Sequence, residues 1–375
     1  MAGASPSRFV NLFLAAWPTG GMRELLDQWR PVIDEAIAEV LPREVDEAYL
    51  ERFFGEPTYA YDAEAIQSGL AEPVWAMLDR GGKRWRAVLF VLLVEAFGAD
   101  PFDYLTYATI PEILHTGTIV VDDVEDGAEL RRGEPALHHQ FGEDVTLNAG
   151  NALYFIPLKL LGANGAGLSA ERQLAAYEML TYELNRTHLG QGMDIHWHNR
   201  RDVDVTEDEY LEMSACKTGC LARIVGRLAA IVTGQPEAVE AAIAAYTERL
   251  SVGFQIIDDV LDVEHSLGRA GAFGKAFGND IREGKTTLLV IHAMRTADPA
   301  DARALAATLA AEDPDDAAVA AAIDLLESTG SIDYARGVAR ELADSAVAAI
   351  EPLDLHPEFE DAVRAFPHFM VDRDV

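Results

Sequence analysis

The sequence carries two acidic clusters with the same D-D-x-x-D spacing, one at 122–126 and one at 258–262. Each cluster follows a long apolar run that is compatible with a helix, 110–121 for the first and 250–257 for the second. On a helix the first and last Asp of such a cluster lie one turn apart on one face, and the second Asp is about 100° away. Three carboxylates so close together repel one another unless a cation neutralises them. The pattern therefore predicts two helices that face each other across a cavity and hold divalent ions between them.

The ligand types in these clusters predict a hard divalent cation. Carboxylate oxygens without nitrogen or sulfur favour Mg²⁺, with Mn²⁺ as the alternative, and Mg²⁺ commonly shares its coordination shell with substrate phosphates. An acidic run is more often a solvated surface than a metal site, but two copies at the ends of two apolar helices favour the metal site. The candidate ligands are Asp122, Asp123, Asp126, Asp258, Asp259 and Asp262.

Helical periodicity dominates the chain, and no run of alternating β-branched residues indicates a strand. We therefore predict an all-α fold. Residues 22–40 have the pattern of an amphipathic helix with a candidate kink at Pro31. Residues 1–45 are interpreted as an N-terminal helical extension of open role, and residues 46–375 as one all-α domain. Other predicted helices cover 71–78, 145–161, 169–189 (ending at Gly190-Gln191-Gly192), 210–233, 239–263, 300–311, 316–328 and 332–353.

The charge balance excludes several classes of partner. The 375 residues include 63 acidic and 30 basic side chains, a formal net charge of −33. Nucleic acids and anionic membrane surfaces both select basic proteins, so neither is an expected partner. Such acidity is typical of proteins from a salt-rich cytoplasm, where ions screen the self-repulsion.

The two cysteines and the distribution of apolar residues also bear on the location of the protein. Cys216 and Cys220 are separated by one helical turn and have no further Cys with which to form a zinc site. Two reduced thiols are typical of a cytoplasmic protein. No apolar run approaches the roughly 18 residues of a membrane span, so we expect a cytoplasmic protein without one.

A basic segment at 83–86 follows Gly81 and Gly82 and precedes a very apolar helical run. Because backbone N–H groups at a helix start also favour anions, the segment predicts a diphosphate site. The simpler alternative is local pairing with Asp79 or Glu72.

Other polar residues accompany the acidic clusters. His115 lies about two helical turns before Asp122 and therefore on the same face. Adjacent arginines after the first cluster can form forked contacts with phosphate oxygens. Gln191 and Asp194 are interpreted as outer groups around a metal. The remaining candidates are Arg131, Arg132, Lys217, Thr218 and Gln255, with Lys275 in a Gly-rich loop and Lys285 after it.

Taken in order, these segments give a specific match. The chain resembles the trans-type isoprenyl diphosphate synthases, or polyprenyl synthetases. The matching segments are GGKRWR (81–86), HTGTIVVDDVEDGAELRRGEPALHHQFG (115–142), GQGMDI (190–195), KTG (217–219), GFQIIDDVLDV (253–263) and GKAFGNDIREGKTTL (274–288). The resemblance implies antiparallel helices around a deep central cavity, a homodimer, and Mg²⁺, three ions per active site.

The resemblance also implies a role for each matching residue. The Asp clusters would bind Mg²⁺ that grips the diphosphate of an allylic substrate, and Asp122, Asp123, Asp126, Asp258 and Asp259 would be catalytic together with Lys217. The same diphosphate would be held by Arg131, Lys217, Thr218, Gln255, Lys275 and Lys285. Isopentenyl diphosphate would be held by Gly82, Lys83, Arg86, His115 and Arg132.

Product length is expected to depend on the helix before the first cluster. In the family that the chain resembles, a bulky aromatic residue four or five positions before the first Asp of this cluster stops chain growth early. Here those positions are Gly117 and Thr118, and the next candidate plug is Leu114, roughly 12 Å below Asp122. The sequence therefore predicts a geranylgeranyl or longer product, and replacement of Gly117 by Phe is expected to shorten it.

Two other functions remain open. A terpene cyclase would share the metal-assisted ionisation but would need no isopentenyl site. A non-catalytic subunit of a heteromeric synthase would often have lost one Asp cluster. Turnover of the allylic substrate alone would indicate the cyclase, and a purified protein without turnover would indicate the subunit.

Overall fold

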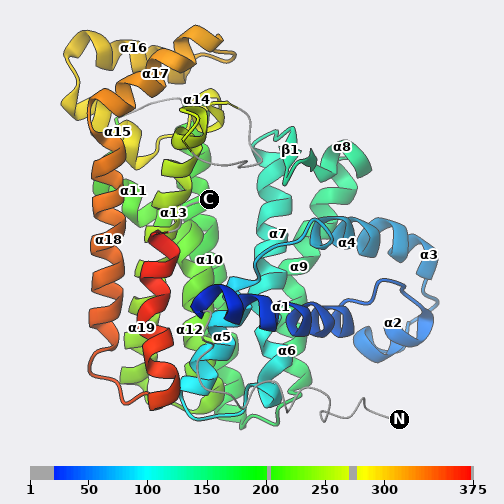
Figure 1. Ribbon diagram of the computed structural model, residues 1–375. Helices are drawn as coiled ribbons and strands as arrows, with labels where there is room; N and C mark the ends of the chain where they lie inside the picture. Colours follow the sequence, from blue (N-terminus) through cyan, green and yellow to red (C-terminus); the bar gives the residue numbers. More distant parts are fainter. Residues whose placement is uncertain (1–20, 201–203, 270–276, 373–375) are drawn as a thin grey trace.

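The computed structural model describes residues 21–200, 204–269 and 277–372. Helices account for nearly all the regular structure in these ranges, which confirms the all-α prediction (Figure 1). Two short strands, β1 (Leu130–Arg131) and β2 (Glu134–Pro135), pair in an antiparallel hairpin just after the first acidic cluster.

The first half of the chain contains both short and long helices. Their bounds are α1 (Gly21–Val40), α2 (Glu47–Phe54), α3 (Ala63–Ile66), π-helical η2 (Gln67–Ala71), α4 (Glu72–Leu78), α5 (Trp85–Ala96), 3₁₀-helical η3 (Pro101–Tyr104), α6 (Leu105–Ala108), α7 (Ile110–Glu125), α8 (Leu137–Phe141), α9 (Glu143–Ala163) and α10 (Ala170–Arg200).

The second half continues the bundle and adds a helical hairpin at one end. Its elements are α11 (Glu207–Ser214), π-helical η4 (Ala215–Gly219), α12 (Cys220–Thr233), α13 (Glu237–Ser266), α14 (Asn279–Arg282), α15 (Leu288–Thr296), α16 (Pro299–Ala310), α17 (Asp316–Ser328), α18 (Ser331–Ile350) and α19 (Pro357–Val371).

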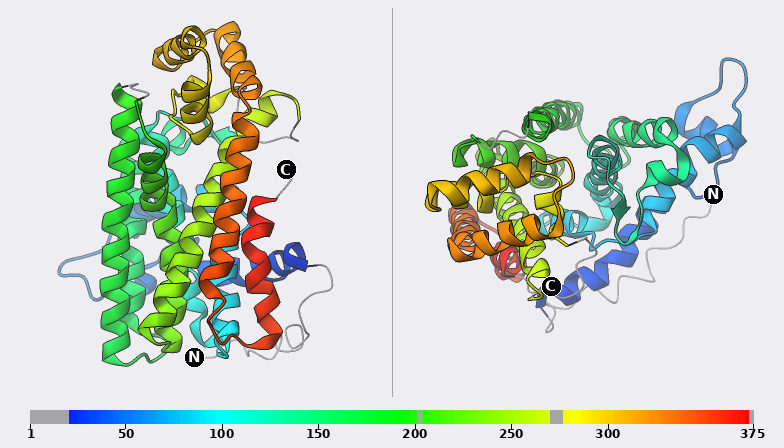
Figure 2. Two further views of the ribbon diagram at one scale, coloured as in Figure 1. Left: turned by 90° about the vertical axis from the view of Figure 1, so that its left-hand side faces the viewer. Right: turned by 90° about the horizontal axis from the view of Figure 1, so that it is seen from above.

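Helices α5 and α12 form the centre of the bundle. Every residue of α5 except Glu95 is buried, as expected for a helix that is apolar on all sides. Helix α12 packs against α5, α10 and α13, while α7 packs along α9 and α13 along α18. Seen from above, α16 and α17 lie over the ends of the long helices on one side of the bundle (Figure 2). This arrangement brings α7 and α13, the carriers of the two acidic clusters, to one cavity.

The N-terminal helix α1 packs onto the bundle through an apolar face. Trp29 and Ile33 are buried in the same cluster as the residues of α5. The helix runs through Pro31 without a break. Residues 21–45 are thus continuous with the main core, although the sequence left the role of this extension open.

Two predicted boundaries were wrong. Helix α10 continues through Gly190-Gln191-Gly192 to Arg200 instead of ending there. The predicted helix 210–233 begins at Glu207 and contains the π-helical turn η4 between α11 and α12. Among the described residues, no helix is long and apolar enough to cross a membrane.

Candidate active site

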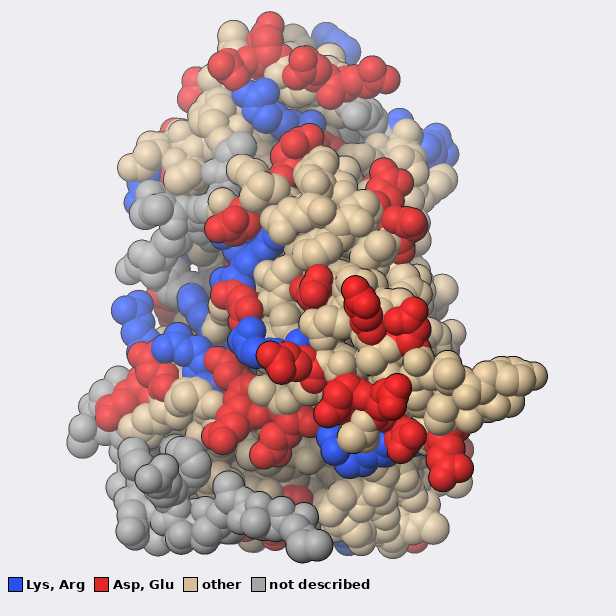
Figure 3. Space-filling model, turned by 90° about the vertical axis from the view of Figure 1, so that its right-hand side faces the viewer, with Lys and Arg blue, Asp and Glu red and all other residues tan. Residues whose placement is uncertain are grey.

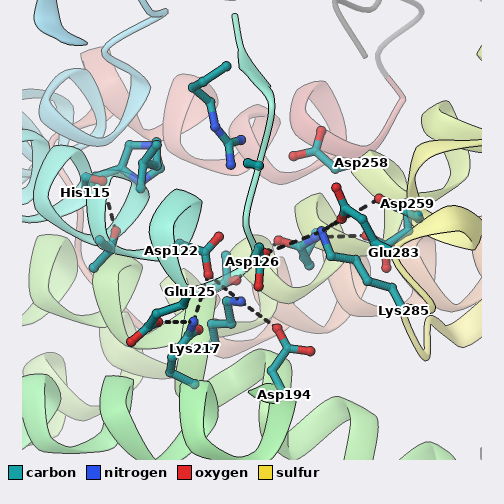
Figure 4. A pocket seen from close by; sticks show the side chains of 18 of the residues that line it. His115, Asp122, Glu125, Asp126, Asp194, Lys217, Asp258, Asp259, Glu283 and Lys285 are labelled. Carbon is teal, nitrogen blue, oxygen red and sulfur yellow. Dashed lines mark hydrogen bonds and ion pairs between the residues drawn. The ribbon is translucent and has the colours of Figure 1, made fainter. Parts of the chain in front are cut away.

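A cavity of about 950 Å³ opens between the helices below α16 and α17. Both acidic clusters and the basic segment line it, and Figure 4 shows Asp122 and Asp126 facing Asp258 and Asp259 across it. The sequence-predicted residues that line it are Gly82, Lys83, Arg86, His115, Thr118, Asp122, Asp126, Arg131, Arg132, Gln191, Asp194, Lys217, Thr218, Gln255, Asp258, Asp259 and Lys285. Lys275 lies outside the described residues.

Lys217 reaches the first acidic cluster from the π-helical turn η4. Its ammonium lies 3.0 Å from Asp122 Oδ1 and 2.6 Å from Asp194 Oδ2. Gln191 Nε2 donates to Asp122 Oδ1 at 2.8 Å and to Glu125 Oε2 at 2.7 Å. A π-helical turn inserts one residue into a helix and often occurs at functional sites. Gln191 and Asp194 were predicted as outer groups around a metal. In the structure Gln191 contacts Asp122, and Asp194 contacts Lys217, the partner of Asp122.

The approach of α10 to η4 depends on Gly190. A Cβ at this position would lie 2.3 Å from the backbone nitrogen of Lys217. Because no side chain fits between the two backbones, glycine at 190 lets α10 come close enough for Gln191 and Asp194 to reach the cavity. The sequence suggested a helix end here because glycine also terminates helices.

The second acidic cluster is held by groups from three elements. The Tyr210 hydroxyl donates to Asp259 Oδ2 at 2.8 Å, and Gln255 Nε2 donates to Asp259 Oδ1 at 2.9 Å. Thr218 in turn donates to the side-chain oxygen of Gln255 at 3.2 Å. Sequence reasoning missed Tyr210, because nothing in its local pattern distinguishes it from a core residue.

Lys285 extends between the two clusters (Figure 4). Its ammonium lies 2.6 Å from Glu283 Oε2, and 3.9 Å from both Asp126 Oδ2 and Asp280 Oδ1. Although burial opposes it, the negative charge of Asp280, Glu283 and Asp126 raises the pKa of Lys285 well above its usual value. Lys285 therefore adds a positive charge to the lining of the cavity.

Two of the predicted metal ligands do not line the cavity. Asp123 is fully buried, and its Oδ1 accepts from both Nε (2.7 Å) and Nη2 of Arg131. Asp262 is 2 % exposed, and its Oδ2 accepts from the backbone N–H of Asp280 at 3.2 Å. Asp123 thus orients Arg131, and Asp262 fixes the start of α14 beneath the second cluster.

Asp122 and Asp126, the two carboxylates of the first cluster that line the cavity, have pKa values shifted in opposite directions. Burial opposes ionisation of Asp122, but the ammonium groups of Lys217 and Lys285 outweigh it and hold its pKa at about 2. Burial and the negative charge of Asp122 raise the pKa of Asp126 to about 7. The cluster therefore accommodates its full negative charge poorly without added cations.

These oxygen donors suit a hard divalent ion. Among the described residues no group of three His, Cys, Asp or Glu side chains already converges as a metal site. Asp122 instead contacts Lys217, and Asp126 lies near Lys285. Burial and the charge of Asp122 both raise the pKa of Asp126, so a bound cation would favour the ionised form of this carboxylate. Such a cation could share its coordination shell with a bound ligand.

The basic segment forms a second, cationic end of the cavity. Arg86 is 4 % exposed, lies over the Trp85 ring, and its Nε has no hydrogen-bond partner among the described residues. Burial lowers the pKa of Arg86 to about 10. Burial together with the charges of Arg86 and Arg132 lowers the pKa of His115 well below its usual value. Crowded cations around a neutral His115 make this end of the cavity suitable for an anion.

The alternative explanation for the basic segment was local pairing with Asp79 or Glu72. Asp79 instead pairs with Arg43, at 2.6 Å. Arg84 pairs with Asp34 at 2.8 Å and lies 3.9 Å from Glu112, two acidic partners that sequence reasoning did not identify.

The helix below Asp122 presents different residues to the cavity than the sequence suggested. Thr118 lines the cavity, but Gly117 and Leu114 are buried elsewhere. A Cβ on Gly117 would lie 2.8 Å from Leu153 Cβ and 2.9 Å from Gly150 O, both on α9. Gly117 therefore permits close packing of α7 on α9, and the premise that its missing side chain leaves the cavity open was wrong.

Comparison with known proteins decides the family. The polyprenyl synthetase family model matches residues 67–326. The chain belongs to the polyprenyl synthetase family. It is an isoprenyl diphosphate synthase, and enzymes of this family use divalent metal ions.

The synthase is similar to several known proteins. It is 33% identical over 298 residues to a short chain isoprenyl diphosphate synthase of Methanothermobacter thermautotrophicus, covering 80% of this chain and 88% of the relative. It is 30% identical over 362 residues to a geranylfarnesyl diphosphate synthase of Natronomonas pharaonis, covering 92% and 95%. The solved geranylgeranyl pyrophosphate synthetase of Pyrococcus horikoshii superposes with a TM-score of 0.79 at 28% identity, covering 94% and 99%.

Proposed function

We propose that this synthase condenses isopentenyl diphosphate with an allylic diphosphate to give a trans-polyprenyl diphosphate. The observation that carries the proposal is one cavity with a carboxylate end and a cationic end. Two diphosphates have to be bound side by side in such a reaction. Asp122, Asp126, Asp258 and Asp259 suit the metal-bound diphosphate, and Lys83, Arg86 and Arg132 suit the other.

Metal ions held by these four carboxylates, Mg²⁺ in the proposed active form and three per site, would neutralise the charge that develops on the leaving diphosphate. Lys217 and Lys285 lie at the same carboxylates, so their ammonium groups can hold the leaving diphosphate once its C–O bond to the allylic carbon breaks. Arg131, oriented by Asp123, adds a further cation.

The remaining steps form the new carbon–carbon bond. The isopentenyl double bond attacks the allylic carbocation, and a proton leaves the new cation for the departing diphosphate. The walls of the cavity must exclude water, which would otherwise quench the carbocation to an alcohol. Apolar Val121, Leu221 and Phe254 line the cavity and support this role.

The decisive test is turnover of purified protein with Mg²⁺, isopentenyl diphosphate and each common allylic primer. We expect elongation, its loss on chelation, and its recovery when Mg²⁺ or Mn²⁺ is added. Asp122→Asn should lower kcat about 100-fold or more, whereas Asp324→Asn, the same change at an exposed site on α17, should not. Hydrocarbon from the allylic substrate alone would indicate a cyclase, and no turnover at all would indicate a partner-dependent subunit.

We also propose a product of geranylgeranyl length or longer. The relatives named above are called short chain, geranylfarnesyl and geranylgeranyl synthases, so their names do not agree on one length. Thr118 is small, and it lines the cavity together with Tyr154, His188 and Leu221. Chromatography of the dephosphorylated products would give the length.

We further propose that the synthase acts in the cytoplasm as a homodimer through α9 and α10. These two helices pack together and carry four strongly exposed apolar side chains: Phe155 (67%), Leu174 (58%), Tyr182 (57%) and Leu189 (64%). The last three recur at seven or eight residues and so lie along one stripe of α10. Sedimentation should show a dimer that Tyr182→Asp combined with Leu189→Asp converts to a monomer, with exposed Asp324→Asn as a control that leaves it intact.

A further inference from the structure

The loop before α5 has an unusual backbone. Arg84, directly before the first residue of α5, has φ of 51°, in the left-handed region that non-glycine residues rarely adopt. Gly81 and Gly82 before it also have positive φ, 81° and 153°. The backbone carbonyl of Arg84 accepts the N–H of Val88 at 3.0 Å and so begins the helix. Such a conformation persists only where surrounding contacts hold it.

The contacts that hold Arg84 come from three other parts of the chain. Its guanidinium is 6% exposed and donates from Nε to Asp34 Oδ1 at 2.8 Å and from Nη2 to the Leu78 carbonyl at 3.1 Å. Its Nη1 lies 3.9 Å from Glu112 on α7. Glu112 also accepts the backbone N–H of Ala87 at 3.3 Å. Arg84 thereby joins α1, α4 and α7 to the start of α5.

This junction lies between two of the cations that line the cavity. Lys83 precedes Arg84 and Arg86 follows it by two residues, so the direction of both side chains depends on the Arg84 backbone. Asp34 does not line the cavity. It is placed by α1, whose Trp29 and Ile33 are buried in the same core as α5.

We propose that Asp34 is a positioning residue for isopentenyl diphosphate: through Arg84 it fixes the loop that presents Lys83 and Arg86. The inference rests on the proposed function, because it assumes that these cations bind that substrate. It also gives the N-terminal helix a role in the reaction that neither acidic cluster suggests.

For the loss of Asp34, electrostatics alone and the positioning role predict opposite changes in diphosphate binding. Removing an acidic group near a cationic site makes the site more positive and should tighten diphosphate binding. If Asp34 acts by position, its loss releases the buried guanidinium of Arg84 and the loop, and diphosphate binding weakens.

The test compares Asp34→Asn with Asp27→Asn. Both substitutions remove one charge from an exposed position of α1, Asp34 being 47% and Asp27 68% exposed. The two differ in their partners, because Asp34 pairs with the buried guanidinium of Arg84 and Asp27 with exposed Arg30. Steady-state kinetics would be measured with isopentenyl diphosphate varied, and separately with the allylic primer varied. We expect Asp34→Asn to raise KM for isopentenyl diphosphate about fivefold or more, with kcat and the allylic KM changed less than about twofold. Asp27→Asn should match the wild type, and Asp34→Glu should recover part of the loss.

A second readout avoids turnover. Calorimetric titration of isopentenyl diphosphate without an allylic primer should give a Kd raised by a similar factor in Asp34→Asn. An unchanged or lower Kd and KM, an equal rise in both substrates' KM values, or a protein that fails to fold would each overturn the proposal by assigning Asp34 no role or a purely structural one. These outcomes are distinct from failure of the proposed function, in which the wild type itself would neither bind isopentenyl diphosphate nor turn over.

Discussion

At the scale of single residues, Gly190 shows how a missing side chain can position a site. A Cβ there would lie 2.3 Å from the Lys217 nitrogen, so Gly190→Ala must push α10 away from η4. We expect a loss of roughly 1–3 kcal/mol in the free energy of unfolding, together with a fall in kcat as Lys217 shifts from Asp122. Urea unfolding and steady-state kinetics measure the two effects.

Gly192 provides the matched control two residues later in the same helix. A Cβ there would meet nothing within 4 Å. Gly192→Ala should therefore stabilise the protein by about 0.5–1 kcal/mol, the ordinary gain of alanine over glycine in a helix. Equal effects of the two substitutions would contradict the packing explanation.

Adjacent residues of α7 should respond differently to the same large substitution. Thr118 lines the cavity about one turn below Asp122, so Thr118→Phe should block chain growth and shorten the main product by at least one isoprene unit. Gly117 faces α9, so Gly117→Phe should instead cost roughly 3 kcal/mol or more of stability. Product chromatography and urea unfolding would show whether the two effects separate in this way.

At the scale of elements, α5 contains one carboxyl group, that of Glu95, which is the only residue of this helix that is not fully buried. Burial and the nearby carboxylates of Asp100 and Glu358 raise the pKa of Glu95 from 4.5 to about 8. The folded state therefore holds this proton more tightly than the unfolded state. The resulting stabilisation is fully present below pH 4.5 and is lost as pH rises through about 8.

Glu95→Gln should remove this dependence on pH. Relative to the wild type, the variant should gain roughly 1–3 kcal/mol in free energy of unfolding between about pH 5 and about pH 9. Urea titrations at both pH values measure the difference, and Glu351→Gln at an exposed position serves as the control. A constant difference between variant and wild type would contradict the raised pKa.

At the scale of the whole molecule, the net charge of −33 should make stability depend on salt. Acidic side chains are spread over much of the face shown in Figure 3, so their repulsion is distributed over the surface. Raising KCl from about 0.1 M to about 2 M shortens the screening length and should raise Tm by roughly 5 °C or more. Sucrose at matched osmolality separates screening from general exclusion of solutes. A Tm that KCl leaves unchanged would mean that the charges are already balanced locally.

The sequence by itself determined the helical class, the family and many of the polar residues that line the cavity. Spacing along a helix determines which residues share a face, and the acidic and basic segments are too unusual to be explained by ordinary surface. Asp122 and Asp258 were predictable for this reason, and so were Lys83 and Arg86.

Only the tertiary structure decided which neighbour each face meets. Periodicity places Asp123 and Gly117 relative to the axis of α7, but it does not say that Arg131 contacts one and α9 contacts the other. A glycine such as Gly190 has the same sequence signal whether it ends a helix or lets another backbone approach. The contact between Asp34 and Arg84 joins residues fifty positions apart, and a pair at that separation has no local pattern. Long-range packing, which depends on the shapes of all the helices together, supplied these answers.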